Sequence, residues 1–168
     1  MLLRGVNVGK HHRIAMPAFR ALLEGVGGTD VRTYVQSGNA VLDRIGSAAA
    51  LEREVRAALV AEHGLDVPVM VRTGRELVDV VAACPWQGEG LDPKLLHVAF
   101  LSGEPDAVAL AAVDHDALLP ERLAVGPRCL YLYYAGGVQR SRLDRVRLGV
   151  DATARNWRTT LALREMAA

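Results

Sequence analysis

The chain has 168 residues, of which 51% are hydrophobic and 23% are charged. This length and balance suit a globular protein with its own core, and they exclude an intrinsically disordered chain. The net charge of +1 excludes the strong overall positive charge that would by itself indicate nucleic-acid binding.

The charge is distributed unevenly along the chain. Residues 1–72 carry nine basic and seven acidic side chains, residues 73–137 carry four and nine, and residues 138–168 carry seven and three. Both ends are therefore basic and the middle is acidic. No run approaches the roughly 20 apolar residues of a membrane helix, and no signal peptide is recognisable, so we expect a cytoplasmic protein without a membrane partner.

The first half of the chain is predicted to follow the order β-α-β-β-α-β. Apolar alternation or short apolar runs indicate strands, and apolar residues three and four apart indicate helices. The predicted elements are a strand at 2–6, a helix from Met16 to Val26, strands at 31–35 and 40–42, a helix between Ser47 and Gly64, and a strand at 67–71.

The second half is predicted to read β-α-β-β followed by a helix. It comes after a helix that starts at a capping box of Thr73 and Glu76 and stops before Pro85. The predicted elements are a strand at 95–101, a helix opened by Pro105, strands at 121–125 and 129–134, and a last helix capped by Thr153 that carries Trp157.

These orders predict the α+β class, with two packed ferredoxin-like sub-domains of the βαββαβ type. We place the N-terminal half at residues 1–85 and the C-terminal half, with its terminal helix, at residues 94–168. The glycine- and proline-containing loop at 86–93 is the predicted boundary, and the two halves are expected to form a single compact unit.

The segment GVNVGK at residues 5–10 follows a strand but lacks the spacing of a phosphate-binding P-loop. A P-loop has four residues between its first glycine and the Gly-Lys pair and then Ser or Thr, whereas here three residues intervene and histidine follows. We therefore exclude a P-loop NTPase. Two interpretations stay open: a loop that holds an anion with Arg4, Lys10 and Arg13 nearby, or a solvated basic loop.

The histidines and cysteines do not have the spacing of a metal site. His11 and His12 are adjacent and cannot easily converge on one ion, and Cys84 and Cys129 form no CxxC pair, so we predict no metal, disulfide or cofactor.

The predicted order of strands and helices in the first half also invites comparison with RNA-recognition domains. However, the third strand, residues 39–42, has no aromatic side chain for bases to stack on, so nucleic acid is not the expected partner.

Polar and basic residues gather at predicted strand ends, turns and the start of the last helix. Backbone amides at such places can join arginine in holding phosphate oxygens. The predicted ligand-binding residues are Arg4, Asn7, Gly9, Lys10, Gln36, Ser37, Asn39, Ser141, Arg142, Arg155 and Asn156. We expect members of this set from both halves to line one cleft. Catalytic residues stay unassigned.

Five stretches of the sequence resemble a bacterial family described as domain of unknown function 1697 (DUF1697). In chain order they are LLRGVNVGKHHRIAM, TDVRTYVQSGNAV, KLLHVAFLSG, YLYYAGGVQRSRL and ATARNWRTTLAL. The resemblance implies the two-part ferredoxin-like fold and brings no established activity. The chain departs from the family pattern at Lys10, where a second glycine is usual, at Arg142, where lysine is usual, and at Arg158, where a small polar residue is usual.

The function predicted from the sequence is a binding module for a small anion or a phosphorylated metabolite. Three alternatives stay open: a homo-oligomeric assembly or regulatory module such as a homodimer, an enzyme acting on a phosphorylated small molecule, and a weak nucleic-acid binder. Binding ranks above catalysis because no nucleophile or general base with a tuned environment is recognisable in the sequence.

Overall fold

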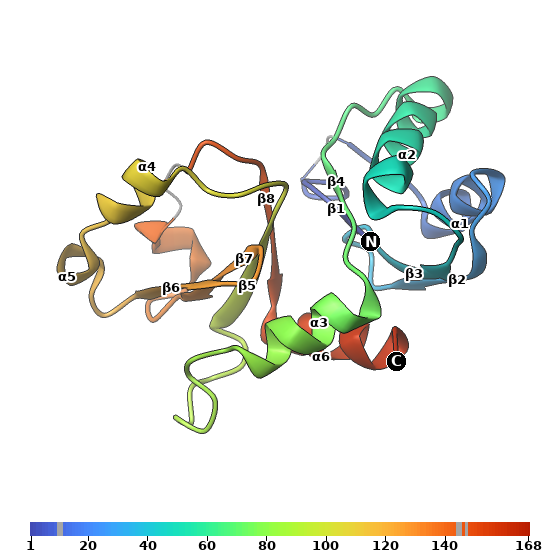
Figure 1. Ribbon diagram of the computed structural model, residues 1–168. Coiled ribbons are helices and arrows are strands. Elements are labelled where there is room, and N and C mark those ends of the chain that lie inside the picture. The colour runs from blue at the N-terminus through green and yellow to red at the C-terminus, as the bar shows by residue number, and fades with distance from the viewer. Residues whose placement is uncertain (10–11, 144–145, 147) are drawn as a thin grey trace. The chain divides into compact units, whose positions relative to one another are not determined.

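The computed structural model describes residues 1–9, 12–143, 146 and 148–168. It divides into a first unit, Met1–Arg75 with Leu163–Ala168, and a second unit, Glu76–Ala162. Each unit contains one four-stranded antiparallel sheet (Figure 1). The α+β class predicted from the sequence is confirmed.

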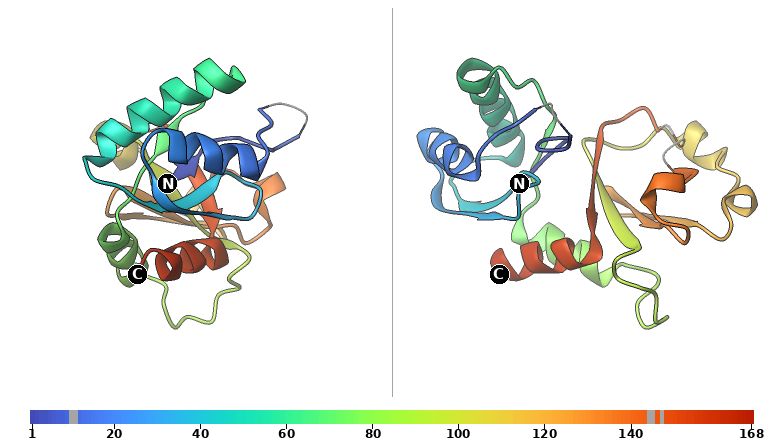
Figure 2. Two further views of the ribbon diagram at one scale, coloured as in Figure 1. Left: turned by 90° about the vertical axis from the view of Figure 1, so that its right-hand side faces the viewer. Right: turned by 180° about the vertical axis from the view of Figure 1, so that it is seen from behind.

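The first unit follows the predicted β-α-β-β-α-β order. Its elements are β1 (Leu2–Leu3), α1 (Met16–Gly25), β2 (Thr29–Tyr34), β3 (Asn39–Asp43), α2 (Ala48–His63) and β4 (Val69–Met70). The strands lie in the order β2-β3-β1-β4, which is the ferredoxin-like arrangement. Helices α1 and α2 cover one face of this sheet (Figure 2), where Phe19, Leu23, Val55 and Leu59 pack with Leu3 in a buried apolar core.

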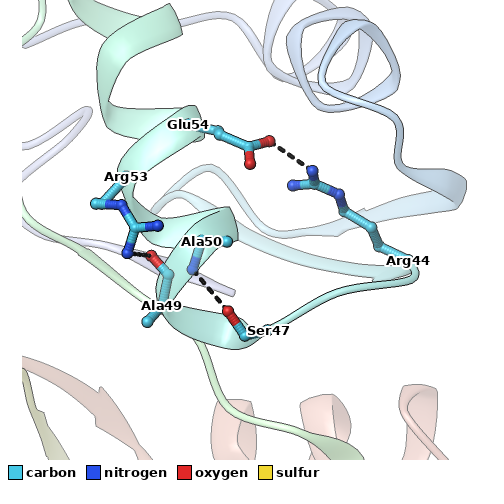
Figure 3. A network of polar contacts seen from close by, with 6 residues as sticks. All are labelled: Arg44, Ser47, Ala49, Ala50, Arg53 and Glu54. Carbon is cyan, nitrogen blue, oxygen red and sulfur yellow. Dashed lines mark hydrogen bonds and ion pairs between the residues drawn. The ribbon is translucent and has the colours of Figure 1, made fainter.

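The boundaries of α2 follow from its two caps. Ser47 Oγ accepts a hydrogen bond from the Ala50 amide at 3.2 Å, and Gly64 ends the helix in the left-handed conformation with φ of 65°. Figure 3 shows this helix start together with the ion pair between Arg44 and Glu54, which links the preceding loop to the helix. The predicted helix between Ser47 and Gly64 is therefore confirmed at both ends.

The second unit repeats the strand order of the first. Its elements are most of α3 (Gly74–Ala82), β5 (Leu96–Leu101), α4 (Ala107–Ala111), α5 (His115–Leu118), β6 (Arg122–Gly126), β7 (Cys129–Tyr133), a 3-10 helix η1 (Val138–Arg140), β8 (Ala152–Asn156) and the first part of α6 (Trp157–Met166). The strands lie in the order β6-β7-β5-β8. The single helix predicted after Pro105 is two short helices, α4 and α5. On one face of the sheet, Leu118 of α5 and Leu143 pack on Leu101 and Leu132.

The strand β8 corrects the prediction for the C-terminal segment. Thr153 lies inside β8 rather than at a helix start, and β8 pairs with β5 over its whole length. The helix α6 begins at Trp157, and Asn156 caps it because Asn156 Oδ1 accepts from the Thr159 amide at 2.8 Å. The strand was missed because Arg155 occupies one of its buried positions, where an apolar residue would have completed the alternation.

The division between the units falls between Arg75 and Glu76, inside α3, and not in the predicted loop at 86–93. The last residues of the chain belong to the first unit, where Arg32 Nη2 donates to the Met166 carbonyl at 2.9 Å. Among the described residues, no helix combines the length and apolar character needed to cross a membrane.

Candidate functional site

The loop after β1 has an unusual backbone. Gly5, Asn7 and Gly9 have φ of 65°, 56° and 66°, whereas the valines between them do not have positive φ. Alternation between left-handed and ordinary backbone is typical of concave N–H surfaces that bind anions. A Cβ atom added at Gly5 or Gly9 would meet nothing within 4 Å. Positive φ therefore favours glycine at these two positions, and the space beside them is open.

Asn7 joins this loop to the turn between β2 and β3. Its Nδ2 donates to the Ile14 carbonyl at 2.8 Å and to the Gln36 carbonyl at 2.7 Å, and its Oδ1 accepts from the Ile14 amide at 3.0 Å. One side chain thus closes the loop and attaches it to the turn. We call residues 4–9, 12–14 and 35–38, which Asn7 holds together, the clamped loops.

The turn at 35–38 carries strain of its own. Val35 has φ of 51° although it is β-branched, and it is 52% exposed. At Gly38, with φ of 73°, a Cβ atom would lie 2.5 Å from Val6 Cγ2, so only glycine fits against the first loop. Gly38 also accepts from the Leu3 amide at 2.8 Å. The turn therefore packs directly on the loop that follows β1.

Asn39 and Ser37 position the turn. Asn39 is fully buried, and its Nδ2 donates to the Tyr34 carbonyl and to Ser37 Oγ, both at 3.0 Å. Asn39 thus supports the turn from inside the unit. Gln36 is exposed and reaches the site through its backbone carbonyl.

The charged side chains of the clamped loops are all basic. Arg4 and Arg13 are exposed, and Arg13 Nη2 donates to the Gly9 carbonyl at 3.0 Å. The first acidic residue of the chain is Glu24, and neither clamped loop contains a carboxylate. Lys10, also predicted here, lies outside the described residues.

Of the ligand-binding residues predicted in the second unit, Ser141 and Arg142 follow η1, whereas Arg155 lies in β8. Ser141 Oγ accepts from the Leu143 amide at 2.9 Å, and Arg142 is exposed. Arg155 is only 8% exposed, and its Nη1 donates to Thr153 Oγ1 at 2.8 Å and to the Ala154 carbonyl at 2.9 Å. Burial lowers the pKa of Arg155 to about 10. Arg155 therefore does not open a helix, contrary to the sequence prediction.

The structure brings together Asn7, the Gln36 carbonyl, Ser37 and Asn39 in the first unit. That residues of both units line one cleft stays a prediction. Arg13 was predicted to lie near this loop but was not included among the ligand-binding residues. The strained backbone at Val35 was not predicted, because valine does not favour positive φ and gives no local signal for it. Among the described residues, no three His, Cys, Asp or Glu side chains are grouped as metal ligands.

Comparison with known proteins agrees with the fold. Among solved structures, conserved bacterial protein SP0830 from Streptococcus pneumoniae is similar, with a TM-score of 0.78 and 20% sequence identity over 99% of this chain and 96% of that chain. No curated protein matches the sequence. The model of a family described as "Protein of unknown function (DUF1697)" matches residues 1–131. Because this match covers most of the chain, the protein belongs to the DUF1697 family.

Proposed function

We propose that this protein is a binding module for a small oxyanion, such as the phosphate group of a metabolite, and that the clamped loops hold it. The observation that carries the proposal is the pair of hydrogen bonds from Asn7 Nδ2, which unite two loops whose charged side chains are all basic. Phosphate is the natural partner of backbone amides and arginine acting together.

The backbone supplies the first part of the recognition. The amides that we assign to the anion are those of Gly5, Val8 and Gly9, where the alternation of φ occurs. Glycine allows a ligand to approach the main chain closely, and the open space beside Gly5 and Gly9 agrees with such an approach. The strain at Val35 is consistent with a site whose shape is maintained by its surroundings.

Arginine supplies the second part. Arg4 and Arg13 lie on the same loop, exposed, in a segment without a carboxylate. Charge-assisted hydrogen bonds contribute about 1.5–3 kcal/mol each, so the loss of one arginine should weaken binding roughly ten- to a hundredfold.

The test is calorimetric titration with inorganic phosphate, glucose 6-phosphate, AMP and a short single-stranded oligonucleotide. We expect the wild type to bind the small phosphates and the variants Arg4→Gln and Arg13→Gln to bind them more weakly. The control Arg53→Gln removes an exposed arginine on α2 that donates to the Ala49 carbonyl of its own helix. It should bind like the wild type.

Three results would overturn the proposal. The first is that the wild type binds none of the small phosphates, which would favour the assembly alternative and a measurement of oligomeric state. The second is that the Arg53→Gln control loses as much affinity for the small phosphates as Arg4→Gln and Arg13→Gln do, which would indicate a general effect of charge. The third is much tighter binding of the oligonucleotide, which would favour the nucleic-acid alternative.

A further inference from the structure

The second unit contains a hollow of about 520 Å³ that the clamped loops do not share. It lies beside α4 and α5, and its volume falls within the range of about 300–1,000 Å³ typical of small-molecule sites. Its apolar wall is formed by Ala109, Ala112, Val113, Leu118 and Val146. An apolar ligand surface of a few carbon atoms would therefore find a matching wall here.

Among the described residues, Arg142 is the cation that lines this hollow. Arg142 is held by two contacts: its Nη1 donates to the Ala117 carbonyl and its backbone amide donates to Glu121 Oε2, each at 2.8 Å. Within residues 1–9, 12–143, 146 and 148–168, the Nε and Nη2 donors of Arg142 have no hydrogen-bond partner. These two donors form the edge of a guanidinium that binds a carboxylate through two parallel hydrogen bonds.

Two described carboxylates near Arg142, those of Glu121 and Asp114, accept hydrogen bonds from backbone amides. Glu121 is buried and accepts from the Arg142 backbone amide. Asp114, which also lines the hollow, caps α5 by accepting from the Ala117 amide at 3.0 Å. In the described part of the chain, neither forms an ion pair with the Arg142 guanidinium. Asp114 is thus the one carboxylate among the described lining residues, and it caps α5 instead of forming an ion pair with Arg142.

We propose that this hollow binds an amphipathic monocarboxylate, with the carboxylate on Arg142 and the hydrocarbon part on the wall formed by Ala109, Ala112, Val113, Leu118 and Val146. The charge of Arg142 selects an anion, its planar donor edge selects a carboxylate, and the wall selects an apolar body. This site is independent of the oxyanion site proposed for the first unit, because no residue is shared.

The test is titration of the full chain with butanoate, hexanoate and octanoate, followed by calorimetry and by the amide resonances of Val113 and Leu118. We expect affinity to rise about fourfold for each added methylene until the wall is covered. Hexylamine has a hydrocarbon chain one carbon longer than that of hexanoate and the opposite charge, and it should not bind.

Two variants complete the test. Arg142→Met keeps an apolar stem but removes the charge, and we expect at least tenfold weaker binding of hexanoate with an unchanged circular dichroism spectrum. The matched control is Arg158→Met, an exposed arginine on α6 that does not line the hollow, and it should bind like the wild type. The proposal is overturned if the carboxylates do not bind, if chain length has no effect, if hexylamine binds equally well, or if a folded Arg142→Met binds hexanoate as tightly as the wild type.

Discussion

The contribution of Asn7 can be worked out bond by bond. Asn7→Ala removes three hydrogen bonds of 2.7–3.0 Å, two to Ile14 and one to Gln36. At about 1 kcal/mol each they total about 3 kcal/mol, and alanine at φ of 56° adds about 1 kcal/mol. Because the site is half-buried and water replaces part of the loss, we expect the free energy of unfolding to fall by about 2–4 kcal/mol.

Two measurements separate these contributions. The first is the urea midpoint of Asn7→Ala and of Asn7→Gly, since glycine accepts the positive φ and should recover about 1 kcal/mol of the loss. The second is hydrogen exchange at the Ile14 amide, which donates to Asn7 Oδ1 and should lose protection in both variants. A fall of less than about 0.5 kcal/mol in Asn7→Ala, or unchanged protection at Ile14, would refute the assignment of Asn7 as the clamp.

Three further predictions concern stability. Ser47→Ala should lower the free energy of unfolding by about 1 kcal/mol, whereas Ser47→Asp should keep most of the stability of the wild type, because a hydroxyl or a carboxylate can cap α2 at the Ala50 amide. Equal urea midpoints for the two variants would contradict this. Gly126→Ala should cost about 1–3 kcal/mol because a Cβ atom there would lie 2.4 Å from Tyr131 Cε2, whereas Gly136→Ala, with nothing within 4 Å, should stay within about 0.5 kcal/mol of the wild type in the same assay. Burial lowers the pKa of His97, whose ring packs edge-on against Tyr134 at 5.0 Å, so the unfolded chain takes up the proton first and melting temperature should fall as pH drops below about 6.5. The His97→Gln variant should show a smaller fall over pH 7 to 5, and an identical pH profile would be contrary to expectation.

The strands and helices of the first unit could be predicted because local signals and tertiary packing agree there. The stripe on α1, the cap at Ser47 and the left-handed Gly64 each indicate the element that the structure contains. The strand β8 could not be recognised, because a buried arginine interrupts its apolar alternation and its pairing with β5 is long-range. The extent of the first unit likewise depends on Arg32 reaching Met166, a contact between residues far apart in the sequence.

The candidate site was predictable in outline and not in detail. The Gly-Val-Asn-Val-Gly spacing indicates alternating backbone conformation, because glycine and asparagine are the residues that most readily adopt positive φ. The link from Asn7 to Gln36 and the conformation of Val35 depend on how β1 and β3 pair, which no local pattern records. The hollow beside Arg142 is formed by residues from separate loops and short helices, whose approach is visible only in three dimensions.

The most direct test of oxyanion binding by the clamped loops is a nuclear magnetic resonance titration of the full chain with inorganic phosphate at constant ionic strength. The amide resonances of Gly5, Val8 and Gly9 should shift and saturate, and the shifts should be lost in the double variant Arg4→Gln, Arg13→Gln. Amides of the α2 helix should stay unchanged and serve as the internal reference. If the three loop amides do not shift, or shift equally in the double variant, the clamped loops are not an oxyanion site.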